Sequence, residues 1–130
     1  MIQLLVALKT SHNDPKLPVF LTDEFVMTTK LKVTVIKKFG PEDVFGPNHG
    51  ITYNGGEIPA CPLELGQEFI VDDHQDRPKG FCGRAWHDLY TTLMSFYYGG
   101  DMEWPGPGAT YQPCGDGVKP VVFKIEKLEN

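Results

Sequence analysis

The residues best suited to chemistry in this chain begin with Cys82. It stands just ahead of a predicted helix, where unpaired backbone N–H groups and the helix dipole stabilise an anion. That position favours the thiolate, which is the form of cysteine that attacks electrophiles and binds metals. One turn on, His87 is a candidate general base, and Asp88 and Asp116 are candidate orienting acids. The alternatives are an inert packed thiol, a surface histidine and two carboxylates satisfied by local backbone.

The cysteines also suggest a metal site. Three thiolates and one imidazole form a common ligand set for zinc. The candidate ligands are Cys61, Cys82 and Cys114 with one of His49, His74 or His87, and His49 is the preferred histidine. Close pairs such as C-x2-C, which are typical of structural zinc sites, do not occur in the sequence. Two alternatives for the cofactor are therefore kept, a single zinc or iron ion or none.

Aromatic residues supply the walls of a predicted pocket. The candidate ligand-binding residues are Trp86, Tyr90, Trp104 and Tyr111. Trp104 lies in a Gly/Pro-rich stretch, so no helical period explains it, and an aromatic side chain there suits a small apolar ligand. We predict a pocket bounded by the start of the helix, the Trp104 loop and residues 114–117. The alternative is that these loops close over the core and leave no cavity.

Composition and motifs exclude several classes of partner. With 12 basic and 17 acidic residues and a net charge of −5, the chain lacks the cations that bind a phosphate backbone, so we expect no nucleic-acid partner. It has neither a P-loop nor a dinucleotide fingerprint, which disfavours a nucleotide cofactor. No apolar run approaches the roughly 18 residues of a membrane span. Three widely spaced cysteines favour free thiols in a cytoplasmic protein, and oligomerisation is left open.

A small set of predicted elements must position these residues. Residues 84–98 carry apolar side chains at three- and four-residue steps and predict one principal helix, which ends at Gly99-Gly100. Residues 30–39, 65–72 and 120–128 are rich in apolar and β-branched types and predict strands. One face of the first strand would carry Leu31, Val33, Val35 and Lys37.

Between these elements lie two long loops. The 14 glycines and 11 prolines of the chain cluster in residues 41–62 and 101–120, which predicts structured loops there. Within the first loop, Asn54-Gly55 predicts a tight turn joining residues 50–53 and 57–60 as a hairpin.

The predicted fold is α+β. It consists of a small, mainly antiparallel sheet packed on one principal helix, about residues 84–98, with long Gly/Pro-rich loops. Residues 1–29 are interpreted as an N-terminal appendage with two strand-like segments, 2–8 and 19–27, and residues 30–130 as a single α+β domain.

Several blocks of sequence resemble those of a known family. The blocks are Cys61-Pro62, Gly66–Val71, Pro78–Cys82, Ala85-Trp86, Asp88–Tyr90, Gly99-Gly100, Cys114–Gly117 and Pro120–Ile125. Together they resemble a family of small, uncharacterised prokaryotic proteins of about a hundred residues, over roughly residues 30 to 128. The family has no established function, so the resemblance implies no activity. Relatives often carry two cysteines where this chain has Pro113-Cys114, and the loop 45–59 is longer here, so a multi-cysteine metal site is not carried over.

Three functional hypotheses follow. The first is a small-molecule enzyme without a nucleotide cofactor, using acid–base or thiol-assisted chemistry of the lyase, isomerase or cyclase type. The second is a non-catalytic metal- or ligand-binding module that uses Cys and His. The third is a protein-interaction domain whose aromatic loop docks a partner.

Overall fold

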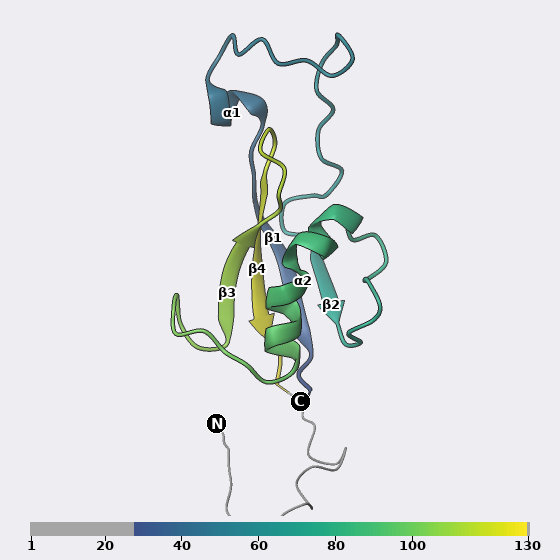
Figure 1. The fold of residues 1–130 in the computed structure, drawn as a ribbon, viewed down its shortest axis with the longest axis vertical. Helices are drawn as coiled ribbons and strands as arrows, with labels where there is room; N and C mark the ends of the chain where they lie inside the picture. Colours follow the sequence, from purple (N-terminus) through teal and green to yellow (C-terminus); the bar gives the residue numbers. More distant parts are fainter. Residues whose placement is uncertain (1–27, 130) are drawn as a thin grey trace, which may run out of the picture.

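A computed structural model of the chain describes residues 28–129 (Figure 1). In chain order these residues form β1 (Leu31–Lys38), α1 (Pro41–Phe45), β2 (Glu68–Val71), α2 (Gly83–Tyr97), β3 (Ala109–Pro113) and β4 (Val121–Lys127). The strand-like segments predicted at residues 2–8 and 19–27 lie outside the described residues.

The four strands form one sheet in the order β2-β1-β4-β3, and all three neighbouring pairs are antiparallel. The principal helix α2 lies along one face of this sheet (Figure 1). Its buried side chains recur at three- and four-residue steps, at Ala85, Leu89, Leu93, Phe96 and Tyr97. The predicted α+β class is therefore confirmed.

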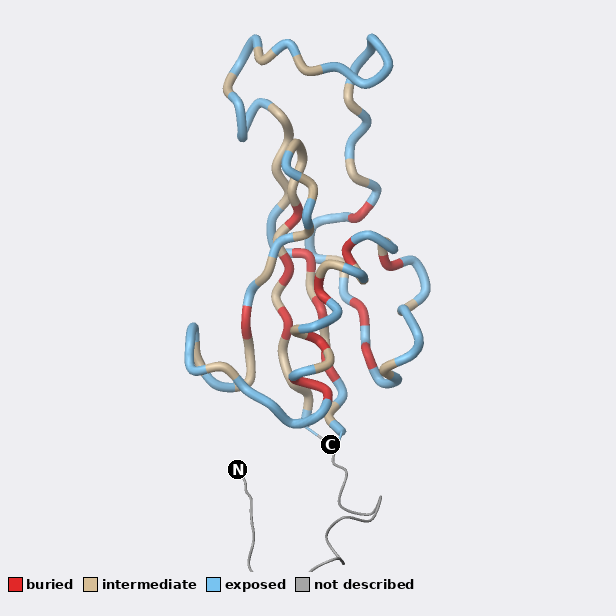
Figure 2. The backbone as a smooth tube through the Cα atoms, viewed as in Figure 1, coloured by how far each residue is buried: buried red, intermediate tan, exposed pale blue. Residues whose placement is uncertain are grey.

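The core lies between α2 and the sheet face that α2 covers. Alternate residues of β1, β2 and β4 supply it, since successive side chains of a strand point to opposite faces. The fully or nearly buried strand residues are Leu31, Val33, Val35, Phe69, Val71, Val121, Phe123 and Ile125. On the other face, Lys32 lies 3.6 Å from Glu68 and 3.7 Å from Glu126 in ion pairs. Figure 2 shows the resulting alternation of buried and less buried residues along the strands.

A β-bulge near the end of β1 changes which lysine points toward the core side. Val35 pairs with Phe123, but the next pair is Lys37 with Val122, so Ile36 is an extra residue. Lys38 is consequently opposite Val121, whose side chain is buried on the helix side. The predicted placement of Lys37 on the core side is wrong, because simple alternation does not anticipate the bulge.

The principal helix and the last strand agree with the predicted ones to within a residue or two at each end, whereas the second predicted strand is shorter. Predicted at 65–72, it is reduced to β2, because Gly66 takes a left-handed conformation (φ 86°) and its N–H bonds to the Val35 carbonyl at 2.7 Å. The turn at Asn54-Gly55 is confirmed, with positive φ at both residues. It closes a single bridge between Tyr53 and Gly56 instead of a full hairpin.

Residues 41–62, here called the arm, extend beyond the end of the sheet (Figures 1 and 2). Within the arm, α1 forms because Pro41 suits a first helical position and the Asp43 carboxylate accepts the Gly40 N–H at 2.7 Å. None of the arm's residues is buried. The arm is therefore held by hydrogen bonds at its base, not by a core of its own.

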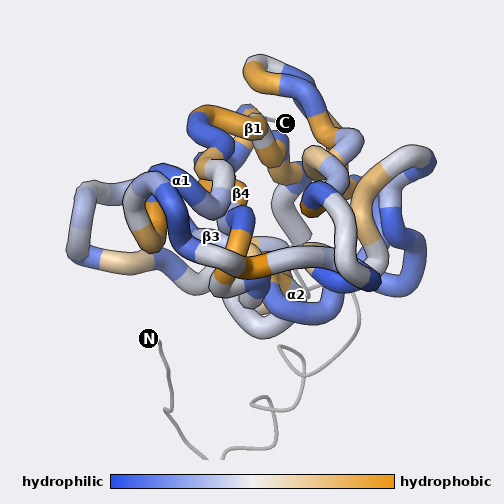
Figure 3. Tube along the Cα trace, turned by 90° about the horizontal axis from the view of Figure 1, so that it is seen from above, coloured by the Kyte–Doolittle hydropathy of each residue, from blue (hydrophilic) through white to orange (hydrophobic). Residues whose placement is uncertain are grey.

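The described residues contain no helix that is long and apolar enough to cross a membrane. Figure 3 shows apolar and polar stretches alternating at short intervals along the chain.

Candidate functional site

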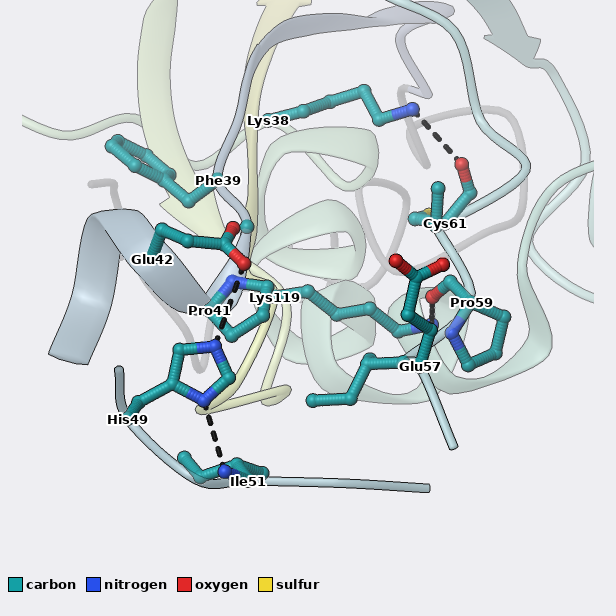
Figure 4. Close-up of a pocket in the computed structure, with 13 residues that line it drawn as sticks. Lys38, Phe39, Pro41, Glu42, His49, Ile51, Glu57, Pro59, Cys61 and Lys119 are labelled. Atoms are coloured by element: carbon teal, nitrogen blue, oxygen red, sulfur yellow. Dashed lines mark hydrogen bonds and ion pairs between the residues drawn. The ribbon is translucent and has the colours of Figure 1, made fainter. Parts of the chain in front are cut away.

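A recess of about 530 Å³ lies at the base of the arm (Figure 4). Its walls come from the end of β1 and the residues after it, from both ends of the arm, and from the connection between β3 and β4. The polar side chains that line it are Lys38, Glu42, His49, Glu57, Cys61 and Lys119, and the apolar ones include Phe39, Pro41, Ile51 and Ile58. Charged groups and an apolar wall thus occur in one hollow.

Two lysines hold the returning end of the arm against the sheet. Lys38 Nζ donates to the Cys61 carbonyl at 2.9 Å, and Lys119 Nζ donates to the Pro59 carbonyl. Within residues 28–129, no carboxylate oxygen lies within 4.0 Å of either ammonium group. Because an ammonium group has three N–H donors, each lysine keeps two for water or a ligand.

The β1 bulge is what brings Lys38 to this recess. Without the extra residue Ile36, strict alternation would direct Lys38 to the opposite face of the sheet. Bulges recur beside functional sites because they re-aim a side chain in this way.

His49 is oriented by hydrogen bonds at both ring nitrogens (Figure 4). The Ile51 N–H donates to Nδ1 at 2.9 Å, and Nε2 lies 3.4 Å from Oε2 of Glu42. Since Nδ1 is an acceptor, the neutral ring carries its proton on Nε2. Its side chain is only 14% exposed. His49 therefore presents a fixed N–H donor on the recess wall, and its ring is not free to act as a base.

A second hollow, of about 390 Å³, adjoins the recess and shares Ile51, Ile58 and Lys119 with it. Asp116 lines this hollow. Partial burial of Asp116 opposes its charged form. The backbone N–H groups of Lys119 (3.0 Å) and Val118 (2.9 Å) donate to its carboxylate, and Arg84 and Lys119 add positive charge nearby. Together these contacts outweigh burial and hold the pKa of Asp116 below its ordinary value. Asp116 thus closes a turn, and it is the one predicted catalytic residue beside these hollows.

The other predicted catalytic residues do not line the recess. Cys82 is the N-cap residue of α2, as predicted, and packs partly buried against the core. His87 has an 89% exposed side chain. Oδ2 of Asp88 accepts the Gly115 N–H at 2.7 Å, and Arg84 donates to the Gly115 carbonyl at 3.0 Å. Asp88 and Arg84 therefore join α2 to the β3–β4 connection in what we call the Asp88 clasp.

The predicted pocket among the helix start, the Trp104 loop and residues 114–117 is not assembled. Trp104 precedes β3 and residues 114–117 follow it, so a strand of roughly 16 Å separates them. The Trp104 loop also follows the end of α2 and not its start. Only residues 114–117 reach the helix start, through the Asp88 clasp. This prediction is wrong because the loop 101–120 contains a strand that its Gly/Pro content concealed.

The four predicted ligand-binding aromatics are likewise dispersed. Trp86 and Tyr90 pack edge to face on α2 with ring centroids 5.5 Å apart, and the Tyr90 hydroxyl donates to the His74 carbonyl at 3.2 Å. Tyr111 pairs with Lys124 on the sheet face away from α2. Trp104 is 83% exposed in a loop whose ends are joined by the Asp101 carboxylate. No common wall results.

The predicted metal ligands are divided between two places. Cys61 and His49 line the recess, whereas Cys82 and Cys114 do not. Across residues 28–129, no group of three or more His, Cys, Asp or Glu side chains is placed to hold a metal ion.

The residues missed by sequence reasoning are Lys38, Glu42, Glu57 and Lys119. None belongs to a recognisable motif; the available signal was the length and Gly/Pro content of residues 41–62, since long ordered loops are commonly functional. Comparison of the chain with protein-family models, curated proteins and solved structures found no match. The family resemblance of its sequence blocks stays a prediction.

Proposed function

We propose that the protein binds a small organic molecule in the recess at the base of the arm. The observation that carries this proposal is the recess itself, about 530 Å³ in volume, with apolar side chains beside a few oriented polar groups. Small-molecule sites have volumes of about 300–1,000 Å³ and this same mixture of lining groups. Of the three functions predicted from the sequence, the ligand-binding module fits best.

Acid–base catalysis in the same recess is a second candidate. The observation favouring it is the Nε2–H of His49, which Ile51 and Glu42 orient from either side of the ring. As a hydrogen-bond donor, such an N–H group can polarise a carbonyl oxygen of a ligand and so assist proton transfer at the neighbouring carbon. Thiol chemistry at Cys82 has less support, because His87 and Asp88 are directed to solvent and to the Asp88 clasp.

The binding proposal is tested by a fragment screen that includes acidic, basic and neutral compounds. We expect hits to shift the backbone amide NMR signals of Ile51, Ile58, Cys61 and Lys119. An Ala60→Phe substitution fills the recess wall and should weaken these hits at least tenfold. Thr91→Phe, at an exposed position of α2, is the matched control. If no hit maps to the recess, the proposal is wrong.

A further inference from the structure

Lys38 and Lys119 differ from three other lysines, all of which lie in the sheet. Lys32, Lys124 and Lys127 each lie within 3.7 Å of a carboxylate oxygen. Lys38 and Lys119 are partly buried, and their ammonium groups contact only backbone carbonyls among the described residues. Although the chain has 17 acidic and 12 basic residues, neither of these two lysines, which lie beside one hollow, has a carboxylate oxygen of residues 28–129 within 4.0 Å.

The two ammonium groups are held on the same side of the recess. Their carbonyl partners belong to Pro59 and Cys61, which are two residues apart on the returning end of the arm. A single carboxylate has two oxygens, and each can accept a charge-assisted hydrogen bond from a different ammonium group. Both lysines also line the recess, so their remaining donors are available to a molecule inside it.

The other charges of the recess limit the charge of the ligand. Glu42 and Glu57 bring their carboxylates to the recess from opposite walls (Figure 4). With His49 neutral, two lysines and two glutamates give the recess no net formal charge. Both glutamate carboxylates would repel a phosphate dianion, and no arginine lines the recess to offset that repulsion. A ligand with a single carboxylate carries half that charge and is repelled less. The apolar wall of Phe39, Ile51 and Ile58 would receive the organic part of the molecule.

We infer that the ligand of the recess is a small organic monocarboxylate, whose carboxylate is bound by Lys38 and Lys119. This inference rests on the binding function proposed above. The alternative role of the two lysines is purely structural, as ties between the arm and the sheet. A charged probe and its neutral analogue distinguish the two roles. If the lysines only tie the arm to the sheet, replacing them lowers the affinity for both probes equally.

The experiment compares phenylacetate with phenylacetamide by NMR titration of the full chain, following the amide signals of Ile51, Ile58 and Cys61. We expect phenylacetate to bind at least tenfold more tightly than phenylacetamide. The Lys38→Met/Lys119→Met variant should lose that difference while its affinity for phenylacetamide changes little. Lys38→Arg/Lys119→Arg, which retains both charges, should keep the preference for phenylacetate. Lys79→Met, at an exposed position outside the recess, is the matched charge control.

Three outcomes would overturn the inference. Equal affinity for the two probes removes the carboxylate preference and leaves the binding function intact. An equal loss of affinity for both probes in the Lys38→Met/Lys119→Met variant assigns the lysines a structural role only. Displacement of phenylacetate by inorganic phosphate at similar concentration shows a general anion site. If neither the probes nor any fragment of the screen maps to the recess, the inference and the binding function both fail.

Discussion

At the scale of single residues, neighbouring side chains on one helical turn have very different surroundings. His87 is directed to solvent, whereas the side chain of Asp88 is 26% exposed and accepts the Gly115 N–H. The Asp88 carboxylate also lies 3.8 Å from Nε of Arg84. With these partners, the Asp88 carboxylate holds the β3–β4 connection against α2. Asp88 therefore has a structural role, although its residue type and its place in the sequence also suit catalysis.

Replacing Asp88 by Ala should lower the free energy of unfolding by about 1–2 kcal/mol, because the Gly115 N–H loses a charged acceptor. Urea denaturation monitored by circular dichroism measures the change. Asp88→Asn keeps an acceptor oxygen and should cost less, and His87→Ala should be close to neutral. Equal stability of Asp88→Ala and the wild type would contradict the structural role of the Asp88 clasp.

Asp116 predicts a pH dependence of stability. Its pKa in the folded protein lies below the ordinary value of 3.8, so the folded state binds its proton less readily than the unfolded chain does. The stability that Asp116 contributes is therefore present above pH 3.8 and is lost as the pH falls through the folded pKa. Asp116→Asn, whose amide oxygen can still accept the two N–H bonds, should unfold with a weaker dependence on pH below 4. An unchanged acid transition would refute this assignment.

Residue types alone identified the position of Cys82 correctly but not the recess. The N-terminal cap of a helix is a local property, and the helix is recognisable from its apolar period. Lys38 reaches the recess only through the bulge at Ile36, and Lys119 only because the β3–β4 connection meets the arm. The bulge and the contact between the β3–β4 connection and the arm both depend on segments that are distant in the chain. A local sequence pattern carries no information about such contacts.

At the scale of elements, the end of α2 depends on two glycines with different requirements. Gly99 adopts φ 96°, a left-handed conformation that suits glycine. A Cβ on Gly100 would lie 2.8 Å from the Ser95 carbonyl oxygen, which is closer than real contacts allow. The first glycine is required by backbone conformation and the second by a close approach.

The Gly99→Ala/Gly100→Ala variant should therefore lose on the order of 1–2 kcal/mol of stability. Thermal unfolding followed by circular dichroism at 222 nm measures it. Gly106→Ala is the matched control, because a Cβ there meets no atom within 4 Å and its φ is not positive. A melting temperature equal to that of the control would show that the helix ends for another reason.

The strands could be predicted where their alternation is long, as in β1 and β4. β3 could not, since its five residues lie between the positive-φ Gly108 and a terminal Pro113 and carry only one buried side chain, Thr110. Proline is compatible with β3 because, in the sheet formed by residues 28–129, β3 is an edge strand that pairs with β4 alone. The composition of residues 109–113 is typical of a loop, and these residues form a strand because they pair with β4.

At the scale of the whole molecule, the class of fold follows from one amphipathic helix and alternating strands, but the strand order does not. The central place of β1 requires it to pair with both β2 and β4, which are far apart in the chain. The location of the recess follows from that arrangement, because the arm leaves β1 and returns toward β2 at the edge of the sheet.

Removing residues 1–26 should leave a folded domain. Residues 28–129 form a four-stranded sheet, α2 and a core between them. We expect the 27–130 chain to unfold cooperatively, with a melting temperature within a few degrees of that of the full chain, as measured by circular dichroism. It should also keep the amide shifts of the recess on binding phenylacetate. An insoluble or non-cooperative product would show that the first residues belong to the core.

The arm's lack of buried residues makes the protein divisible. A cut in the arm would separate a fragment that carries β1 and α1 from one that carries β2, α2, β3 and β4. No core contact would be lost at the cut, yet the second fragment would lack the middle strand of its sheet and leave β2 and β4 without a shared neighbour. The two fragments should therefore reassemble as a split protein. Lys38 would come from one fragment and Lys119 from the other, so that a carboxylate ligand bridging them would promote reassembly.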